Sequence, residues 1–208
     1  MFVVQPHKNL LVMNIRDKEN EELLSALKEV GIEAGGIYDL VSERNSYRKG
    51  IPVLIQKLKN GVQDRALKEG IIRALGAKEA RKTEAAKVLA EEYHKLPKDE
   101  EIMRWTIGNT FSIIAEDQDF KTISKIVSDP SNGKSREMFV ASLSRLKLAE
   151  AESLLITLLD DDEVSAHALN ALGKKRSLAA RTKIEALTGH PNKLIRKEAL
   201  RAIKRIDK

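Results

Sequence analysis

One apolar pattern recurs five times in the 208 residues, and it limits the possible fold more than any other feature. Each copy ends at an apolar anchor residue, and the residues three, four and eight positions before it are mostly apolar or small. These offsets lie on one face of an α-helix, so each copy predicts an amphipathic helix with one buried stripe. The anchors are Leu75, Ile114, Leu146, Leu172 and Ile203, and the buried positions three residues earlier are Ile72, Phe111, Leu143, Leu169 and Leu200.

The composition agrees with an all-helical chain. Aromatic residues make up 4%, whereas sheet proteins are enriched in them, and the 11 glycines and 5 prolines are few for a turn-rich fold. Cysteine is absent, which excludes disulfides, thiolate metal sites and a cysteine nucleophile. No apolar run is long enough for a membrane span or a signal sequence, so we expect a cytoplasmic protein with no membrane partner.

A second helix precedes each stripe helix, which makes about five helical hairpins. Hairpins spaced by 26–39 residues stack into an α-solenoid, so we predict an all-α, right-handed α-α superhelix with an N-terminal capping segment. The predicted domains are a cap at 1–46 and a solenoid at 47–208, with repeats at about 47–81, 82–118, 119–149, 150–177 and 178–208. The stripe helices are predicted at 63–76, 99–116, 134–147, 163–173 and 193–206, and the cap contains a helix at 20–30 and a short one at 37–43.

Two segments carry a resemblance to a known family, Val164 to Gly173 and Ile195 to Ile203, each with an Ala-x-x-Ala-Leu or similar ending. They resemble the second helix of HEAT repeats, in particular the short bacterial repeats related to those of phycobilisome lyases. Three further segments, 37–41, 46–54 and 104–109, look like a group of small stand-alone bacterial HEAT proteins with no settled activity. The resemblance implies a fold and a binding architecture, but it assigns no reaction.

Solenoids bind partners on the concave face formed by their second helices. Residues two, five and nine positions before each anchor point away from the buried stripe and select candidates for this face. Trp105, the only tryptophan, is the centre of the predicted site, either stacking on a partner or packing over a neighbouring repeat. The predicted partner-binding residues, which include two arginines of the basic column described next, are Arg104, Trp105, Asn109, Arg136, Glu137, His167 and Asn170.

A second column lies ten positions before the anchors and is mostly basic. It contains Arg65, Arg104, Arg136, Asp162 and Lys193. Two interpretations are open: the column grips a linear anion or acidic peptide, or its members form an Asp/Arg ladder that ties neighbouring repeats together.

The charge is concentrated at the C-terminal end. Residues 174–208 carry twelve Lys or Arg and three Asp or Glu, within a chain of net charge +6. This end is either a footprint for nucleic acid or a solvated helix face. The candidate basic patch is Lys174, Lys175, Arg176, Lys193, Arg196, Lys197 and Arg201.

No catalytic motif is present: there is no Walker loop, no dinucleotide fingerprint and no nucleophile elbow. The four histidines have no metal-binding spacing, and the acidic run Asp160 to Glu163 lacks the pattern of a calcium loop, so we expect no catalytic residues, no metal and no cofactor. The sequence therefore predicts a non-catalytic scaffold that binds a protein or peptide. The alternatives are a nucleic-acid-binding HEAT protein, including a DNA glycosylase for alkylated bases, and, by the resemblance to phycobilisome-lyase repeats, a lyase or a lyase partner; the oligomeric state is left open.

Overall fold

Helices and short loops account for the architecture. The computed structural model describes the backbone of residues 6–42 and 46–208 and the side chains of residues 17–41 and 46–208, and the regular secondary structure in these residues is helical throughout. The chain divides into two compact units, Met1–Glu92 and Tyr93–Lys208. This boundary lies inside the predicted repeat 82–118, and the predicted cap at 1–46 belongs to the first unit.

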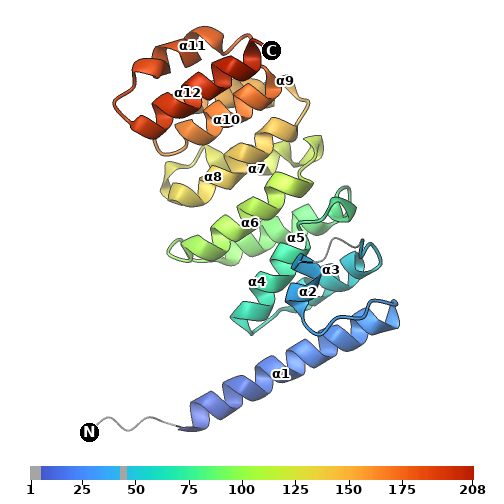
Figure 1. The fold of residues 1–208 in the computed structure, drawn as a ribbon. Helices are drawn as coiled ribbons and strands as arrows, with labels where there is room; N and C mark the ends of the chain where they lie inside the picture. The colour runs from blue at the N-terminus through green and yellow to red at the C-terminus, as the bar shows by residue number, and fades with distance from the viewer. Residues whose placement is uncertain (1–5, 43–45) are drawn as a thin grey trace, which may run out of the picture. The chain divides into compact units, whose positions relative to one another are not determined.

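The first unit contains α1 (Pro6–Glu29), α2 (Ile37–Ser42), α3 (Gly50–Asn60), α4 (Arg65–Ala74), the 3₁₀ turn η1 (Lys78–Ala80) and most of α5 (Ala85–Lys95). Helix α1 packs on α3, and α2 packs on α4 (Figure 1). Leu23, Leu54 and Ile71 are fully buried in its core. Helix α1 starts fourteen residues before the predicted 20–30.

The second unit contains the remaining predicted hairpins. Its α-helices are α6 (Glu101–Ile114), α7 (Phe120–Val127), α8 (Glu137–Ser142), α9 (Ala149–Thr157), α10 (Ser165–Lys175), α11 (Arg181–Ala186) and α12 (Lys193–Ile206). Short 3₁₀ turns extend or connect them: η2 (Asp117–Asp119), η3 (Pro130–Arg136), η4 (Leu143–Arg145), η5 (Leu158–Asp160) and η6 (Leu187–Gly189).

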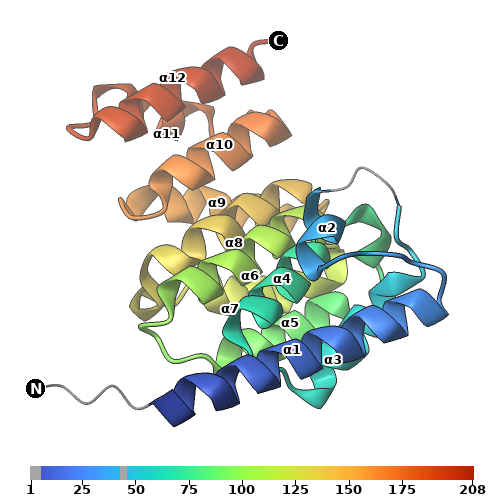
Figure 2. The ribbon, with the colours of Figure 1, turned by 60° about the horizontal axis from the view of Figure 1, so that its bottom comes forward.

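The stripe helices of this unit form one continuous row. Helix α6 packs on α8, α8 on α10, and α10 on α12, while α7, α9 and α11 pack against the row as the first helices of the hairpins. The row can be followed in both ribbon views (Figures 1 and 2). Helices α8 and α10 have a stripe helix on either side, so their apolar residues are covered by the adjacent hairpins.

Burial follows most of the predicted stripe, but the fifth anchor, Ile203, and Met138 are only partly buried. The first four anchors and Ile72, Phe111, Leu143 and Leu169 are all buried. Leu200, predicted to be buried, is 59% exposed, and its neighbour Leu194 is 54% exposed. The equivalent leucine of α10, Leu169, is covered because α12 packs on α10, whereas no hairpin of the described part of the chain covers Leu200. The buried stripe of α12 is instead Ile195, Ala199, Ala202 and Ile206.

Two glycines allow neighbouring stripe helices to approach closely. A Cβ atom on Gly108 of α6 would lie 2.9 Å from the Phe139 ring of α8, and one on Gly173 of α10 would lie 2.9 Å from the Ala202 Cα atom of α12. Real Cβ contacts are longer than this, so a side chain at either position would push the helices apart. The α6–α8 and α10–α12 interfaces are therefore each fitted by their own pair of residues.

Candidate functional site

The row of stripe helices presents a partly exposed surface that contains most of the predicted partner-binding residues. Trp105 and Asn109 lie one turn apart on α6, Glu137 lies at the start of α8, and His167 and Asn170 lie on α10. All five side chains are partly exposed, and Trp105 is not part of the buried core. We call these five residues the second-helix face.

An exposed apolar residue that the sequence analysis did not select adjoins this face. Ile102 is 66% exposed and lies one helical turn before Trp105 on α6. Residues three apart on a helix are neighbours, so Ile102 and Trp105 share one side of α6. Ile102 lies twelve residues before the anchor Ile114, and the predicted pattern of buried and concave-face positions did not extend that far.

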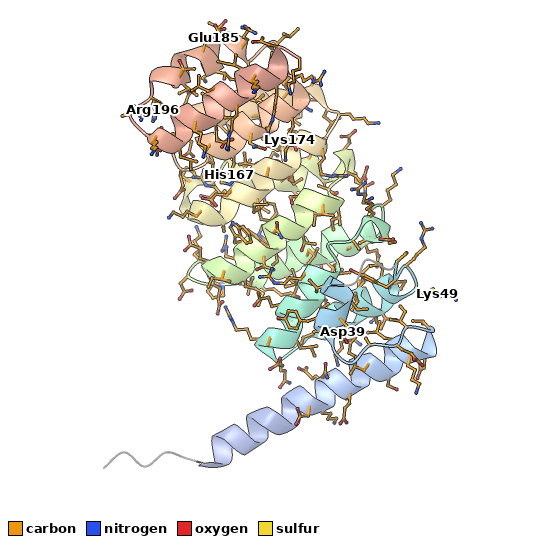
Figure 3. All side chains as sticks on the ribbon, in the orientation of Figure 1. Asp39, Lys49, His167, Lys174, Glu185 and Arg196 are labelled. Carbon is orange, nitrogen blue, oxygen red and sulfur yellow. The ribbon has the colours of Figure 1, made fainter. Side chains whose placement is uncertain are left out.

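Polar contacts organise the α10 end of the second-helix face. The Asn170 side-chain amide lies 3.4 Å from Glu198 Oε2, and Glu198 is buried and paired with Arg201 at 2.5 Å. The Nδ1 atom of His167 is buried and has no hydrogen-bond partner among the described residues. Figure 3 shows His167 and Lys174 at opposite ends of α10. Because of these contacts and this burial, only the outer parts of the His167 and Asn170 side chains are available to a partner.

Arg136 does not line this face, contrary to the prediction. Its side chain is buried at the start of α8 and forms ion pairs with Asp161 (2.6 Å) and Glu163 (2.5 Å), which precede α10. Its guanidinium also donates to the backbone oxygens of Gly133 and Val127. Burial alone lowers the pKa of Arg136, but hydrogen bonds and the charges of the two carboxylates raise it above its ordinary value. The inter-repeat ladder, not the anion grip, is the arrangement found at this position.

Arg104 is also buried, with 4% of its surface exposed, and so it does not line the second-helix face either. Its guanidinium lies 4.2 Å from the centroid of the Tyr93 ring and donates to Asn132 Oδ1 at 2.5 Å. An offset of ten residues places Arg104 in the first turn of α6 and Arg136 directly before α8, where both side chains reach the loops of adjacent hairpins. Spacing in the sequence could not distinguish this direction from one toward a partner.

Three of the seven residues of the predicted basic patch form hydrogen bonds or an ion pair within the protein. Lys175 donates to the Leu146 carbonyl at 2.6 Å, and Arg196 donates to the His190 and Pro191 carbonyls at 2.6 and 2.7 Å. Arg201 is exposed but paired with Glu198. The remaining four residues, Lys174, Arg176, Lys193 and Lys197, are exposed and form no ion pair within the described part of the chain.

A shallow hollow on α12 adds apolar surface to this charge. It has a volume of about 460 Å³ and includes Leu200 between Lys197 and Lys204. Lys204, which the sequence analysis did not select, is exposed on the same helix. The C-terminal end of the second unit is thus both cationic and partly apolar.

No cluster of three or more His, Asp or Glu side chains that could hold a metal ion occurs in the described part of the chain. Among the same residues, no helix has the length and hydropathy of a membrane span.

Comparisons with known proteins support the fold. No family model matches the sequence, and no curated protein matches it. A designed armadillo repeat protein matches the structure with a TM-score of 0.51 at 17% identity, covering 95% of this chain and 98% of its own. The crystal structures of two engineered proteins match with TM-scores of 0.53 and 0.50 at 18% and 20% identity, covering 88% and 82% of this chain and 98% and 87% of theirs.

At these identities the likeness concerns the fold alone. It confirms that the chain is an all-α repeat solenoid of the armadillo-like kind, as the apolar pattern predicted. The closer relationship to phycobilisome-lyase repeats and to small bacterial HEAT proteins stays a prediction, as does the right-handed superhelix.

Proposed function

We propose that the chain is a non-catalytic repeat scaffold that binds a protein or peptide partner on the second-helix face. The observation that carries this proposal is the partly exposed Trp105 beside the 66% exposed Ile102 on α6. Tryptophan is enriched among the residues that contribute most to binding at protein interfaces, and apolar neighbours exclude water around it. The scaffold architecture agrees with the designed repeat protein that shares the fold.

The neighbouring helices supply polar groups for specificity. Asn109, Glu137, His167 and Asn170 lie on three successive helices of the row and are partly exposed. Stacked helices are roughly 10 Å apart, so a peptide crossing the row meets a new set of side chains at about each third extended residue. An apolar centre with polar surroundings is the usual composition of a protein interface.

Selection from a random-peptide library tests this proposal. Peptides selected on the full chain are expected to lose at least about tenfold in affinity for the Trp105→Ala variant, because truncation of a central aromatic residue removes a large contact. Leu178→Ala is the matched control, since Leu178 is an apolar residue of the same unit that is 74% exposed outside the stripe helices. Selected peptides that bind both variants as well as wild type would show that the partner surface lies elsewhere.

The environment of Trp105 can be measured before any partner is known. Its fluorescence is expected to be red-shifted in the native protein and quenched by iodide, because part of the ring is exposed. A blue-shifted emission that iodide does not quench would place the ring in the core and remove the centre of the proposed site.

Nucleic-acid binding is a second candidate function, favoured by the exposed lysines of α12. Lys193, Lys197 and Lys204 form no ion pair within the described residues. Binding of labelled duplex and single-stranded DNA should then weaken steeply between about 50 and 200 mM salt, and a triple Lys→Gln variant at these positions should weaken it further. The control is the triple Lys→Gln variant at Lys28, Lys49 and Lys87, which removes the same charge from the exposed surface of the first unit.

The glycosylase alternative needs a carboxylate free to act on an extruded base. Glu163 and Glu198 are held in ion pairs with Arg136 and Arg201, so Glu137 is the candidate on the second-helix face. Release of alkylated bases from DNA by wild type, lost in Glu137→Gln, would replace the scaffold proposal with an enzymatic one.

A further inference from the structure

A polar pocket in the second unit lies apart from the residues of the second-helix face. It has a volume of about 310 Å³ and is bounded by the end of α5, the loop that follows it, the last turn of α7 and the loop before α8. The lining residues that matter here are Tyr93, Lys98, Arg104, Lys125, Asp129 and Asn132. None of them contributes to the scaffold function proposed above.

Arg104 forms the buried wall of this pocket. A guanidinium has five N–H donors, and Arg104 uses two of them, on Asn132 Oδ1 at 2.5 Å and on the Leu96 carbonyl at 3.4 Å. Its Nε atom is buried and has no acceptor among the described residues. No carboxylate in the described part of the chain forms an ion pair with Arg104. The positive charge is thus buried with a ring face and an amide as its main neighbours.

Comparison with Arg136 shows that the Arg104 site lacks a carboxylate partner. The two arginines occupy the same position in successive repeats, ten residues before the anchors Ile114 and Leu146. Arg136 meets two carboxylates from the next loop, whereas Arg104 meets the neutral amide of Asn132. A buried charge is unfavourable unless it is paired. The charge of Arg104 is therefore not neutralised by a carboxylate, whereas the charge of Arg136 is.

The mouth of the pocket adds further positive charge. Lys98 and Lys125 are both exposed there, and Lys125 forms no ion pair within the described residues. Asp129 is the single carboxylate in the lining, and it is already engaged by the Ser131 backbone N–H at 3.0 Å and by Lys98 at 3.9 Å. Three cations against one carboxylate leave the pocket electropositive.

We propose that this pocket binds the phosphate group of a small phosphate monoester. Arg104 would donate N–H groups from the wall, and Lys125 and Lys98 would neutralise the remaining charge at the mouth. Guanidinium groups match the geometry of phosphate oxygens and form strong charge-assisted hydrogen bonds with them. The volume is at the lower end of the range for ligand pockets, which fits a small molecule that carries one phosphate.

The test uses the full chain and two probes, inorganic phosphate and glycerol 3-phosphate, with binding followed by isothermal titration calorimetry at low salt. Saturable binding with one site per chain is expected for wild type. Lys125→Gln is expected to weaken binding by at least about tenfold, since it removes a charge-assisted contact without disturbing buried residues. Lys121→Gln, an exposed lysine one turn earlier on α7 and outside the pocket lining, is the matched control and should bind as wild type does.

Arg104→Gln is expected to abolish binding, and its folding is checked by circular dichroism. If this variant does not fold, the difference between Lys125→Gln and Lys121→Gln still decides the question. The proposal is overturned if wild type binds neither probe, if the two lysine variants weaken binding equally, or if acetate competes as well as phosphate. A phosphoserine peptide that binds much more tightly than glycerol 3-phosphate would identify the phosphate as part of a protein and overturn the small-molecule assignment.

Discussion

At the scale of single residues, two arginines of one register position have acquired different surroundings. The sequence predicted the basic column at Arg104 and Arg136 and left open whether it ties repeats together or holds an anion. The answer depends on the loop of the following hairpin, which supplies Asp161 and Glu163 to Arg136 but Asn132 to Arg104. Periodicity within one helix contains no information about that loop, so burial of the two side chains could not be predicted.

Removal of the Arg136 side chain is expected to destabilise the second unit. Arg136→Met should lower the free energy of unfolding by about 2–4 kcal/mol, below the value for a fully buried pair, because the two carboxylates are partly exposed and regain water. Urea denaturation followed by Trp105 fluorescence measures this change. Arg181→Met, which removes a partly exposed arginine from its pairs with Glu185 and Asp207, should change the midpoint little. Equal effects of the two substitutions would contradict a structural role for the Arg136 ion pairs.

Tyr47 makes the stability of the first unit depend on alkaline pH. Burial, with repulsion by Glu79, raises the pKa of Tyr47 from 10.0 to about 12, and its hydroxyl donates to the Ala74 carbonyl at 2.5 Å. The folded chain keeps the phenol proton at a pH where the unfolded chain loses it. Its contribution to stability is therefore present below about pH 10 and is lost as the pH rises toward 12.

Urea denaturation followed by far-ultraviolet circular dichroism, at about pH 9 and pH 11.5, measures this effect. Wild type is expected to lose more stability over this interval than Tyr47→Phe, which lacks the titrating group. Parallel losses in the two proteins would show that other groups cause the alkaline decline.

At the scale of helices, the periodic pattern predicted where helices occur better than it predicted which of their residues are buried. Four of the five stripe helices occur close to the predicted ranges, because apolar periodicity and the Gly, Pro and Asn breakers both act locally. The third, predicted at 134–147, is the shorter α8, flanked by the 3₁₀ turns η3 and η4. The predicted burial of Leu200 was wrong because the position of a residue in the stripe does not reveal whether a neighbouring hairpin covers it. Partial exposure of Trp105 and His167 agrees with their register positions, although partner binding there stays a prediction.

The close approach of α10 and α12 depends on Gly173. Gly173→Ala should lower the free energy of unfolding of the second unit by about 1–3 kcal/mol, because the new methyl group meets the Ala202 backbone at 2.9 Å and backbone cannot move aside cheaply. Gly189→Ala is the control, since a Cβ atom there meets nothing within 4 Å. Chemical denaturation followed by Trp105 fluorescence distinguishes them, and a Gly173→Ala protein as stable as the control would mean that the two helices pack less tightly than described.

At the scale of the whole molecule, the two units differ in how they can be observed. The only tryptophan, Trp105, belongs to the second unit, so tryptophan fluorescence reports the unfolding of that unit while circular dichroism reports helices in both. The fold class was predictable because the apolar stripe spans both units. Their division near residue 92 was not, because no linker-like composition occurs there.

A substitution that creates a cavity in the core of the second unit should lower its stability, and Trp105 fluorescence during denaturation measures the loss. Leu169 is fully buried on α10, and Leu169→Ala is expected to lower the unfolding free energy by about 2–5 kcal/mol. Leu200→Ala provides the comparison, because the same residue type at the equivalent position of α12 is 59% exposed and should contribute far less. Similar losses for both would mean that Leu200 is covered in solution, for example by a second copy of the chain.

The glycine contacts of the row also bear on how faithfully the chain finds its own fold. In an array of identical repeats, one hairpin docks on the wrong neighbour with little loss, which makes misassembly a characteristic failure of repeat proteins. Here Gly108 receives the ring of Phe139 and Gly173 receives the backbone at Ala202, so a hairpin shifted by one repeat would bring a large residue against a site shaped for a small one. The difference between these two contacts thus favours the native pairing of the hairpins over a shifted one.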